Sequence, residues 1–351
     1  MTHQELLTIA LHEAKGTAPE NYSNNQVKAA FVDGLRELAG SINDFNRNRY
    51  DIYDIVIRVA EEVVPMKVEA AIGQFAEIQN VPQGQRAVFR RKVGKNRAKQ
   101  FITRVGVSGV YETFRLDTDT FPVEANAIGG GATIDFERML DGVESLSDVM
   151  EALTDGLAYG IYGEVHKALR AAFNASSRPA ANKYTSTTFE ADEMVKLMSV
   201  VRAYGPGVAI FAPPEFVAAM GADAIVPVPS SGSYGGVYHP GDIDAIHNTG
   251  YIKIFRGAPV VEIPQSFTDE NNTTTQIDPQ MAYVLPSGRD SKVVKVVMEG
   301  PTIIWDFTNK DQSMEIHTYK KMGAAIMTYN DWGIYQNTEI LNNVDEDIYG
   351  Y

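Results

Sequence analysis

Residues 78–111 contain no acidic side chain, and this stretch constrains how the chain can fold more than any other feature of the sequence. It holds eight basic residues: Arg86, Arg90, Arg91, Lys92, Lys95, Arg97, Lys99 and Arg104. With +8 in this segment and a net charge of −14 for the whole chain, the other residues carry −22. Because burying unpaired charges is strongly unfavourable, the segment must lie in solvent or against an acidic surface.

The same stretch has the residue pattern of a long β-hairpin. RAVFRRKV and QFITRVGVSGVYETF are rich in Val, Phe, Ile and Thr, and GKNRAK between them has the composition of a turn. A two-stranded hairpin is marginally stable by itself in water, so we expect it to lie on another surface. That surface need not belong to the same chain.

Three interpretations of this basic hairpin are open. Its cations could contact nucleic-acid phosphates while aromatic side chains stack on bases. It could instead lie across an acidic neighbouring subunit, or be a solvated hairpin with no partner. We favour the neighbouring subunit, because the negative charge of another copy is available without further assumptions.

Exposed ion pairs contribute only about 0.2–1 kcal/mol each, so the cations would set the register of such a contact while apolar groups supply adhesion. The predicted contact residues are Arg86, Phe89, Arg90, Arg91, Lys92, Lys95, Arg97, Lys99, Phe101 and Arg104.

The overall composition is that of a globular protein of 351 residues, long enough for about two compact units. Cysteine is absent, which excludes disulfides, thiolate metal sites and cysteine nucleophiles. The first residues carry His3, Glu5, His12 and Glu13 through their apolar stretch, unlike a signal peptide. No run of about 18 apolar residues indicates a membrane span, so we expect synthesis in the cytoplasm and no membrane partner.

Helical patterns occupy the N-terminal part and one central segment. NNQVKAAFVDGLRELAGSI predicts a helix capped by Asn24 or Asn25, and a second helical stretch from Tyr50 should end or kink at Pro65. Ser145 should cap a long helix over SLSDVMEALTDGLAYGIYGEVHKALRAAFN, whose glycines indicate a close backbone approach or a bend. We interpret GGG at 129–131 as a flexible joint before that helix.

The C-terminal half alternates between helix and strand patterns. A polar linker is expected at 175–188, followed by a mixed layer domain containing VAIFA, PPEFVAAMG and PVVEI. KVVKVVM, PTIIWDF, MEIHTYKK and GAAIMTY then predict consecutive antiparallel strands that form a sheet against the long central helix.

No credible active site is found in the sequence. HPGDIDAIH places His239, Asp242, Asp244 and His247 in one loop, but the spacing fits no metal-ligand template. AIGGGATIDFERM lacks the Lys and Ser/Thr of a phosphate loop. The serines of PVPSSGSYGG lack a nucleophile elbow, and a hydrolase using the region from Ser230 to His247 is a distant alternative. We therefore expect no enzymatic activity, no cofactor and no metal.

The order of these parts resembles the major capsid proteins of tailed bacteriophages, which have the Hong Kong 97 fold, an α+β fold. VAIFAPPEFVAAMG, IFRGAPVVEIP and MEIHTYKKMGAAIMTYNDWGIYQ are similar to segments of that family. The resemblance covers residues 50–336. It implies an extended basic β-hairpin loop at 78–121, a peripheral domain with a long spine helix at 122–184, an axial domain at 185–299, and closing strands of the peripheral domain at 300–336. The helical patterns and the charge add an N-terminal helical arm at 1–77 and an acidic C-terminal tail at 337–351.

The resemblance implies a structural protein that self-assembles into the icosahedral shell around a viral double-stranded DNA genome. Its partners would be copies of itself in pentamers and hexamers, with scaffold, portal and decoration proteins as further candidates, and it would enclose DNA without sequence-specific binding. It would reside in the virion capsid after assembly in the host cytoplasm. The alternatives are an encapsulin-type nanocompartment shell and a nucleic-acid-binding protein that uses the basic hairpin directly.

Overall fold

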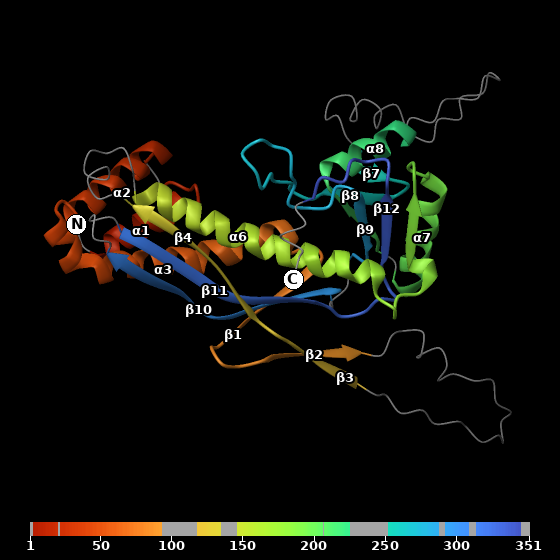
Figure 1. Ribbon diagram of the computed structural model, residues 1–351, viewed down its shortest axis with the longest axis horizontal. Helices are drawn as coiled ribbons and strands as arrows, with labels where there is room; N and C mark the ends of the chain where they lie inside the picture. Colours follow the sequence, from red (N-terminus) through yellow and green to blue (C-terminus); the bar gives the residue numbers. More distant parts are fainter. Residues whose placement is uncertain are drawn as a thin grey trace.

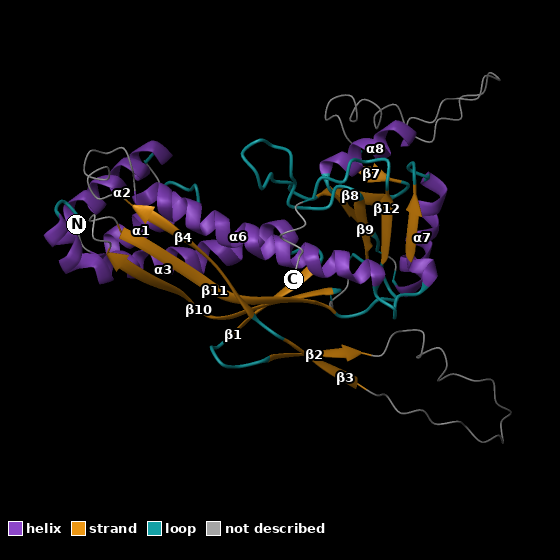
Figure 2. Ribbon diagram, viewed as in Figure 1, coloured by secondary structure: helices purple, strands orange, loops and turns teal. Residues whose placement is uncertain are grey.

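The computed structural model describes residues 3–19, 22–92, 118–134, 146–205, 207–224, 252–287, 292–308 and 314–344. These residues form an elongated body, in which long helices lie along a twisted four-stranded sheet, and a second body built on a six-stranded sheet (Figure 1). Figure 2 shows that helices cover one face of the four-stranded sheet. The α+β class expected from the sequence is confirmed.

Three helices form the N-terminal part: α1 (His3–Ala14), α2 (Asn24–Leu38) and α3 (Ile42–Ile72). The cap of α2 is Ser23, not the expected Asn24 or Asn25. Its side chain accepts a hydrogen bond from the Gln26 amide, and the Gln26 side chain accepts one from the Ser23 amide. Apolar faces of the three helices share a core that Ile316 of the four-stranded sheet completes. The arm is therefore a packed helical unit.

Helix α3 continues through Pro65, although the sequence predicts an end or kink there. A proline inside a helix removes one hydrogen bond and costs about 3 kcal/mol. Here Val63, Val64 and Val68 are fully buried beside it. Packing of this apolar face offsets the local cost, and the helix remains continuous.

The four-stranded sheet has the order β1 (Ala76–Val81), β10 (Val294–Thr308), β11 (Met314–Ile326) and β4 (Asn126–Ile134). β1 is parallel to β10, and the other pairs are antiparallel. The sequence predicts four consecutive strands from residue 292, but the structure has two long ones, β10 and β11, so the expected number is wrong. Their antiparallel pairing is as predicted. Their register shifts between Glu299 and Ile303, where Gly300 has φ +67°, a conformation that favours glycine.

Glycines 129–131 lie inside strand β4, so their interpretation as a flexible joint is wrong. A Cβ at Gly129 would lie 2.4 Å from the Thr318 carbonyl oxygen and 2.6 Å from the Tyr319 Cβ of β11. At Gly131 it would lie 3.0 Å from Nδ1 of His317. Gly129 and Gly131 are thus needed for close approach to β11.

Two neighbouring substitutions test this role of the glycines. Gly129→Ala is expected to lower the free energy of unfolding by about 1–3 kcal/mol, because the added methyl overlaps the β11 backbone. Gly130→Ala is the matched control, since nothing lies within 4 Å of its added Cβ. Chemical denaturation measures both, and equal losses would contradict the packing explanation.

Helix α6 (Leu146–Ala171) is the predicted long central helix, and its apolar stripe is confirmed at Leu157, Ile161, Val165 and Leu169, all buried. At Gly160 an added Cβ would lie 2.7 Å from Cγ2 of Ile128, so the expected close approach occurs there. At Gly156 the corresponding space is open. The expected cap, Ser145, lies outside the described residues.

The six-stranded sheet has the order β5 (Lys183–Ser186), β12 (Gly333–Asn337), β9 (Met281–Leu285), β6 (Ala209–Ala212), β8 (Ala258–Glu262) and β7 (Ile254–Phe255). Helices α7 (Ala191–Tyr204) and α8 (Pro214–Ala224) share its core, and two 3-10 turns, η1 (Ala172–Asn174) and η2 (Ala180–Asn182), lead into it. The expected polar linker at 175–188 therefore contains a strand.

Sheet membership also differs from the expected domain ranges. β12 lies in the six-stranded sheet although it falls at the end of the range expected for the closing strands, 300–336. β10 starts at Val294, inside the range expected for the axial domain. Both differences arise because strand pairing is set by contacts distant in sequence. One continuous apolar core joins α3, α6 and both sheets. None of the described helices is long and apolar enough to cross a bilayer.

Candidate subunit interface

The basic hairpin begins as a regular antiparallel pair. Strand β2 (Ala87–Lys92) pairs with β3 (Thr118–Val123), with Ala87 opposite Val123 and Lys92 opposite Thr118. The sequence placed the returning strand at 100–114, which lies outside the described residues. The strand that pairs with the base of the hairpin is thus farther along the chain than expected. Figure 1 shows β2 and β3 on the side of the four-stranded sheet away from α6.

One face of this pair is packed on the chain's own sheet. Ala87, Phe89 and Val123 are 2–6% exposed and form a small core with Val297 of β10. The ring centroid of Phe89 lies 5.8 Å from that of Phe121 and 5.4 Å from Nζ of Lys295. Phe89 therefore anchors the hairpin to its own subunit, which corrects its assignment to the contact with another subunit.

The opposite face of the pair is exposed. Val88 is 55% exposed, and Arg86 and Arg90 are exposed on either side of it. Arg86 lies 4.0 Å from Glu124 (Nη2 to Oε1). Because both of these side chains are largely exposed, this pairing is weak and leaves Arg86 accessible to a partner. Alternation along β2 thus separates an anchoring face from a cationic outer face.

The remaining predicted contact residues are described only in part. Arg91 and Lys92 belong to β2, but the structure describes only their backbone. Lys95, Arg97, Lys99, Phe101 and Arg104 lie outside the described residues. The structure therefore places Arg90 and the backbone of Arg91 and Lys92 on strand β2, with Arg86 directly before it.

The link between hairpin and body is held by a carboxylate. The Gly84 amide donates a hydrogen bond of 2.9 Å to Oε1 of Glu299, next to the register shift in β10. Gly84 itself has φ +81°, a conformation that favours glycine. Lys321 lies 3.8 Å from the same oxygen of Glu299. This arrangement fixes where the hairpin leaves the sheet.

The other sequence candidates do not form a chemical site in the described part of the chain. The histidine and aspartate loop around His239 and the serines from Ser230 lie outside it. Within the described ranges, no group of three or more His, Asp or Glu side chains is arranged to hold a metal ion.

Two buried basic side chains near the end of α6 were not found by sequence reasoning. His166 is 1% exposed, and neither ring nitrogen has a hydrogen-bond partner among the described residues. Burial lowers its pKa to about 4. The guanidinium carbon of Arg178 lies 4.0 Å from the centroid of the Trp332 ring. Nε of Arg178 donates a hydrogen bond of 2.8 Å to the Ala172 carbonyl oxygen. No local pattern predicts either, because their surroundings come from distant strands.

Comparison with known proteins identifies the kind of molecule that carries this hairpin. The family described as "SPbeta prophage-derived putative capsid protein YonB" matches residues 5–336. The chain belongs to this family. It is a capsid protein, and the resemblance to tailed-phage capsid proteins is confirmed. No curated protein matches the chain.

Solved capsid structures share the fold at low sequence identity. The capsid of Cyanophage P-SCSP1u matches with 12% identity and a TM-score of 0.51, covering 76% of this chain and 87% of its own. The mature capsid of bacteriophage PhiM1 matches with 10% identity and a TM-score of 0.50, covering 76% and 87%. The capsid of a native GTA particle gives 10% identity and a TM-score of 0.50, covering 76% and 90%. These likenesses show the capsid fold.

Proposed function

We propose that this capsid protein is the major subunit of an icosahedral shell that encloses a double-stranded DNA genome, and that it has no enzymatic role. Membership of a capsid protein family over residues 5–336 is the observation that carries the proposal. Copies of the subunit would assemble into pentamers and hexamers in the host cytoplasm. Scaffold, portal and decoration proteins are further candidate partners.

The basic hairpin is the proposed contact between subunits. Its anchored inner face fixes the direction in which it leaves the body, and its outer face carries cations that its own chain leaves mostly solvated. The predicted set then consists of Arg86, Arg90, Arg91, Lys92, Lys95, Arg97, Lys99, Phe101 and Arg104, without Phe89. A protein of net charge −14 offers acidic surface for such a ribbon on every copy.

Charge reversal tests this contact. Replacing Arg90, Arg91 and Lys92 by glutamate is expected to abolish or malform shells, because the ribbon would then repel its acidic partner. Subunit folding should stay largely intact, since Arg90 is exposed. Electron microscopy and thermal unfolding measure the two effects.

The matched control reverses three exposed cations away from the hairpin: Arg47, Lys196 and Arg202. It changes net charge by the same amount and should leave shells intact. Normal shells from the hairpin variant would show that the ribbon does not set the contact.

A salt titration separates the proposal from direct nucleic-acid binding. The isolated subunit is expected to bind double-stranded DNA weakly, because its overall charge is negative. Tight binding whose affinity falls steeply with salt would favour the nucleic-acid alternative. Copurification of a cargo enzyme with the particles would instead favour a nanocompartment.

A further inference from the structure

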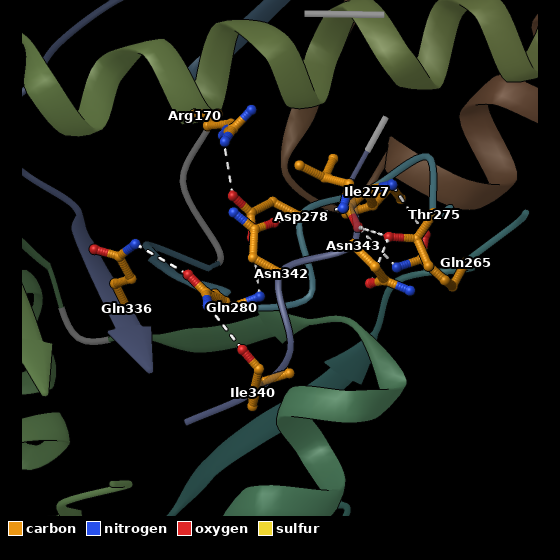
Figure 3. A network of polar contacts seen from close by, with 11 residues as sticks. Arg170, Gln265, Thr275, Ile277, Asp278, Gln280, Gln336, Ile340, Asn342 and Asn343 are labelled. Carbon is orange, nitrogen blue, oxygen red and sulfur yellow. Dashed lines mark hydrogen bonds and ion pairs between the residues drawn. The ribbon is translucent and has the colours of Figure 1, made fainter. Parts of the chain in front are cut away.

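Helix α6 bridges the two bodies, and near its C-terminal end it forms an ion pair with a buried carboxylate of the six-stranded body. Nε of Arg170 lies 3.0 Å from Oδ2 of Asp278, whose side chain is 2% exposed (Figure 3). Arg170 belongs to α6, whereas Asp278 lies in the segment that leads into β9. Asp278 is the buried partner, whereas the Arg170 side chain is 23% exposed. Separation of the pair would leave the Asp278 carboxylate buried without its cation, which is costly.

Asp278 is held firmly within the six-stranded body. The Gln280 amide donates to Oδ1 of Asp278 at 3.0 Å, and the side-chain amide of Gln280 donates to the Ile340 carbonyl oxygen at 2.7 Å. Gln265 brackets Ile277, accepting from its amide at 2.9 Å and donating to its carbonyl oxygen at 2.8 Å. Figure 3 shows these side chains converging from the loop before β9 and from the C-terminal segment. A displacement of Asp278 would disturb all of them.

A second polar contact joins the same two parts at another point of α6. The side-chain amide of Gln276 donates a hydrogen bond of 2.6 Å to the carbonyl oxygen of Tyr159. Along a helix with a rise of 1.5 Å per residue, Tyr159 and Arg170 are about 16 Å apart. One attachment would permit rotation about itself. Two attachments separated along the axis fix the direction of α6 relative to the six-stranded sheet.

The apolar contacts at this junction supply adhesion but little directional preference. Val165, Leu169, Tyr283 and Trp332 belong to one buried cluster, and apolar burial is non-directional. Polar groups with defined hydrogen-bond and ion-pair partners add directional preference to this contact.

We propose that the Arg170–Asp278 pair, with the Gln276–Tyr159 contact, sets the angle between the two bodies and thereby the curvature of the shell. The statement about curvature rests on the proposed function as a shell subunit. The statement about the angle does not, because it concerns the isolated subunit. In a closed shell a small change of angle in every subunit adds up around the particle, so loss of the pair should give particles of different sizes.

The test removes the ion pair without leaving a buried charge. Arg170→Met with Asp278→Asn removes both charges, while the introduced asparagine side chain retains an acceptor for the Gln280 amide. The angle is measured by spin labels on Ala70→Cys of α3 and Ala203→Cys of α7, two exposed positions in a chain that otherwise has no cysteine. The labelled protein with the ion pair intact should give a single narrow distribution of label-to-label distances. The labelled double variant should give a broader distribution.

The control is Lys67→Met with Asp155→Asn, which removes an ion pair between α3 and α6 inside the elongated body. It should keep the narrow distribution and one particle diameter in electron micrographs, whereas the junction variant should give several diameters. Circular dichroism checks that both variants fold, and the single substitution Asp278→Asn serves if the double variant does not. An unchanged distance distribution in the junction variant would overturn the proposal that the Arg170–Asp278 pair sets the angle between the two bodies. A broadened distribution with one particle diameter would overturn its link to curvature, and absence of shells from the parent would count against the proposed function alone.

Discussion

Replacing Phe89 by alanine is expected to release the base of the hairpin from its own sheet. The side chain is 6% exposed and packs with Ala87, Val123 and Val297, so its removal should cost about 3–5 kcal/mol. The loss of stability should appear first as faster amide exchange in β2 and β3, since Phe89 joins these strands to β10. Hydrogen exchange of the β2 and β3 amides, together with chemical denaturation, measures it.

Val88→Ala is the matched control for Phe89→Ala. Val88 is the preceding residue of β2, but its side chain lies on the exposed face. The control should change subunit stability by less than about 0.5 kcal/mol. Equal protection of β2 and β3 in the two variants would show that the inner face does not anchor the hairpin.

Acid is expected to destabilise the subunit through His166. Burial lowers the pKa of this imidazole to about 4, from an ordinary value of 6.5. Between these two values the unfolded chain binds a proton that the folded chain does not. The contribution to stability is therefore complete above about pH 6.5, decreases as pH falls toward 4, and changes no further below that. The full loss is about 3 kcal/mol.

His166→Phe isolates this effect from other acid-sensitive groups. The ring keeps its place against Tyr283, whose centroid lies 6.0 Å away, but it can no longer take up a proton. Denaturation curves at pH 7 and pH 4 should differ less for the variant than for the parent. His12→Gln serves as a control at a less buried histidine. Parent and His166→Phe losing the same stability in acid would rule out His166 as the cause.

Features with strong local patterns could be predicted from the sequence. The stripe of α6 repeats every three to four residues, and its buried positions followed directly from that period. The sequence predicts a joint at the glycines of β4 and a break at Pro65 of α3, because both residue types disfavour regular structure locally, and both predictions are wrong. In the folded chain, close packing on β11 and burial of the α3 face outweigh those preferences.

The candidate interface was located by charge, but its two faces were not. A run of cations marks the hairpin, whereas the burial of Phe89 depends on Val297, which is about 200 residues away in sequence. The Arg170–Asp278 pair had no signal at all, since a single arginine and a single aspartate are common on any surface. Only the topology of β9 and α6 brings them together.

The most direct test of the central claim is a cryo-electron microscopy map of assembled particles in which the hairpin can be traced. We expect the outer face of β2 and the segment beyond Lys92 to contact an adjacent copy, with Arg86 and Arg90 against its acidic side chains. Phe89 should stay packed on its own sheet. A map in which the outer face of β2 and the segment beyond Lys92 contact only their own subunit, or extend into solvent without touching another copy, would contradict the account.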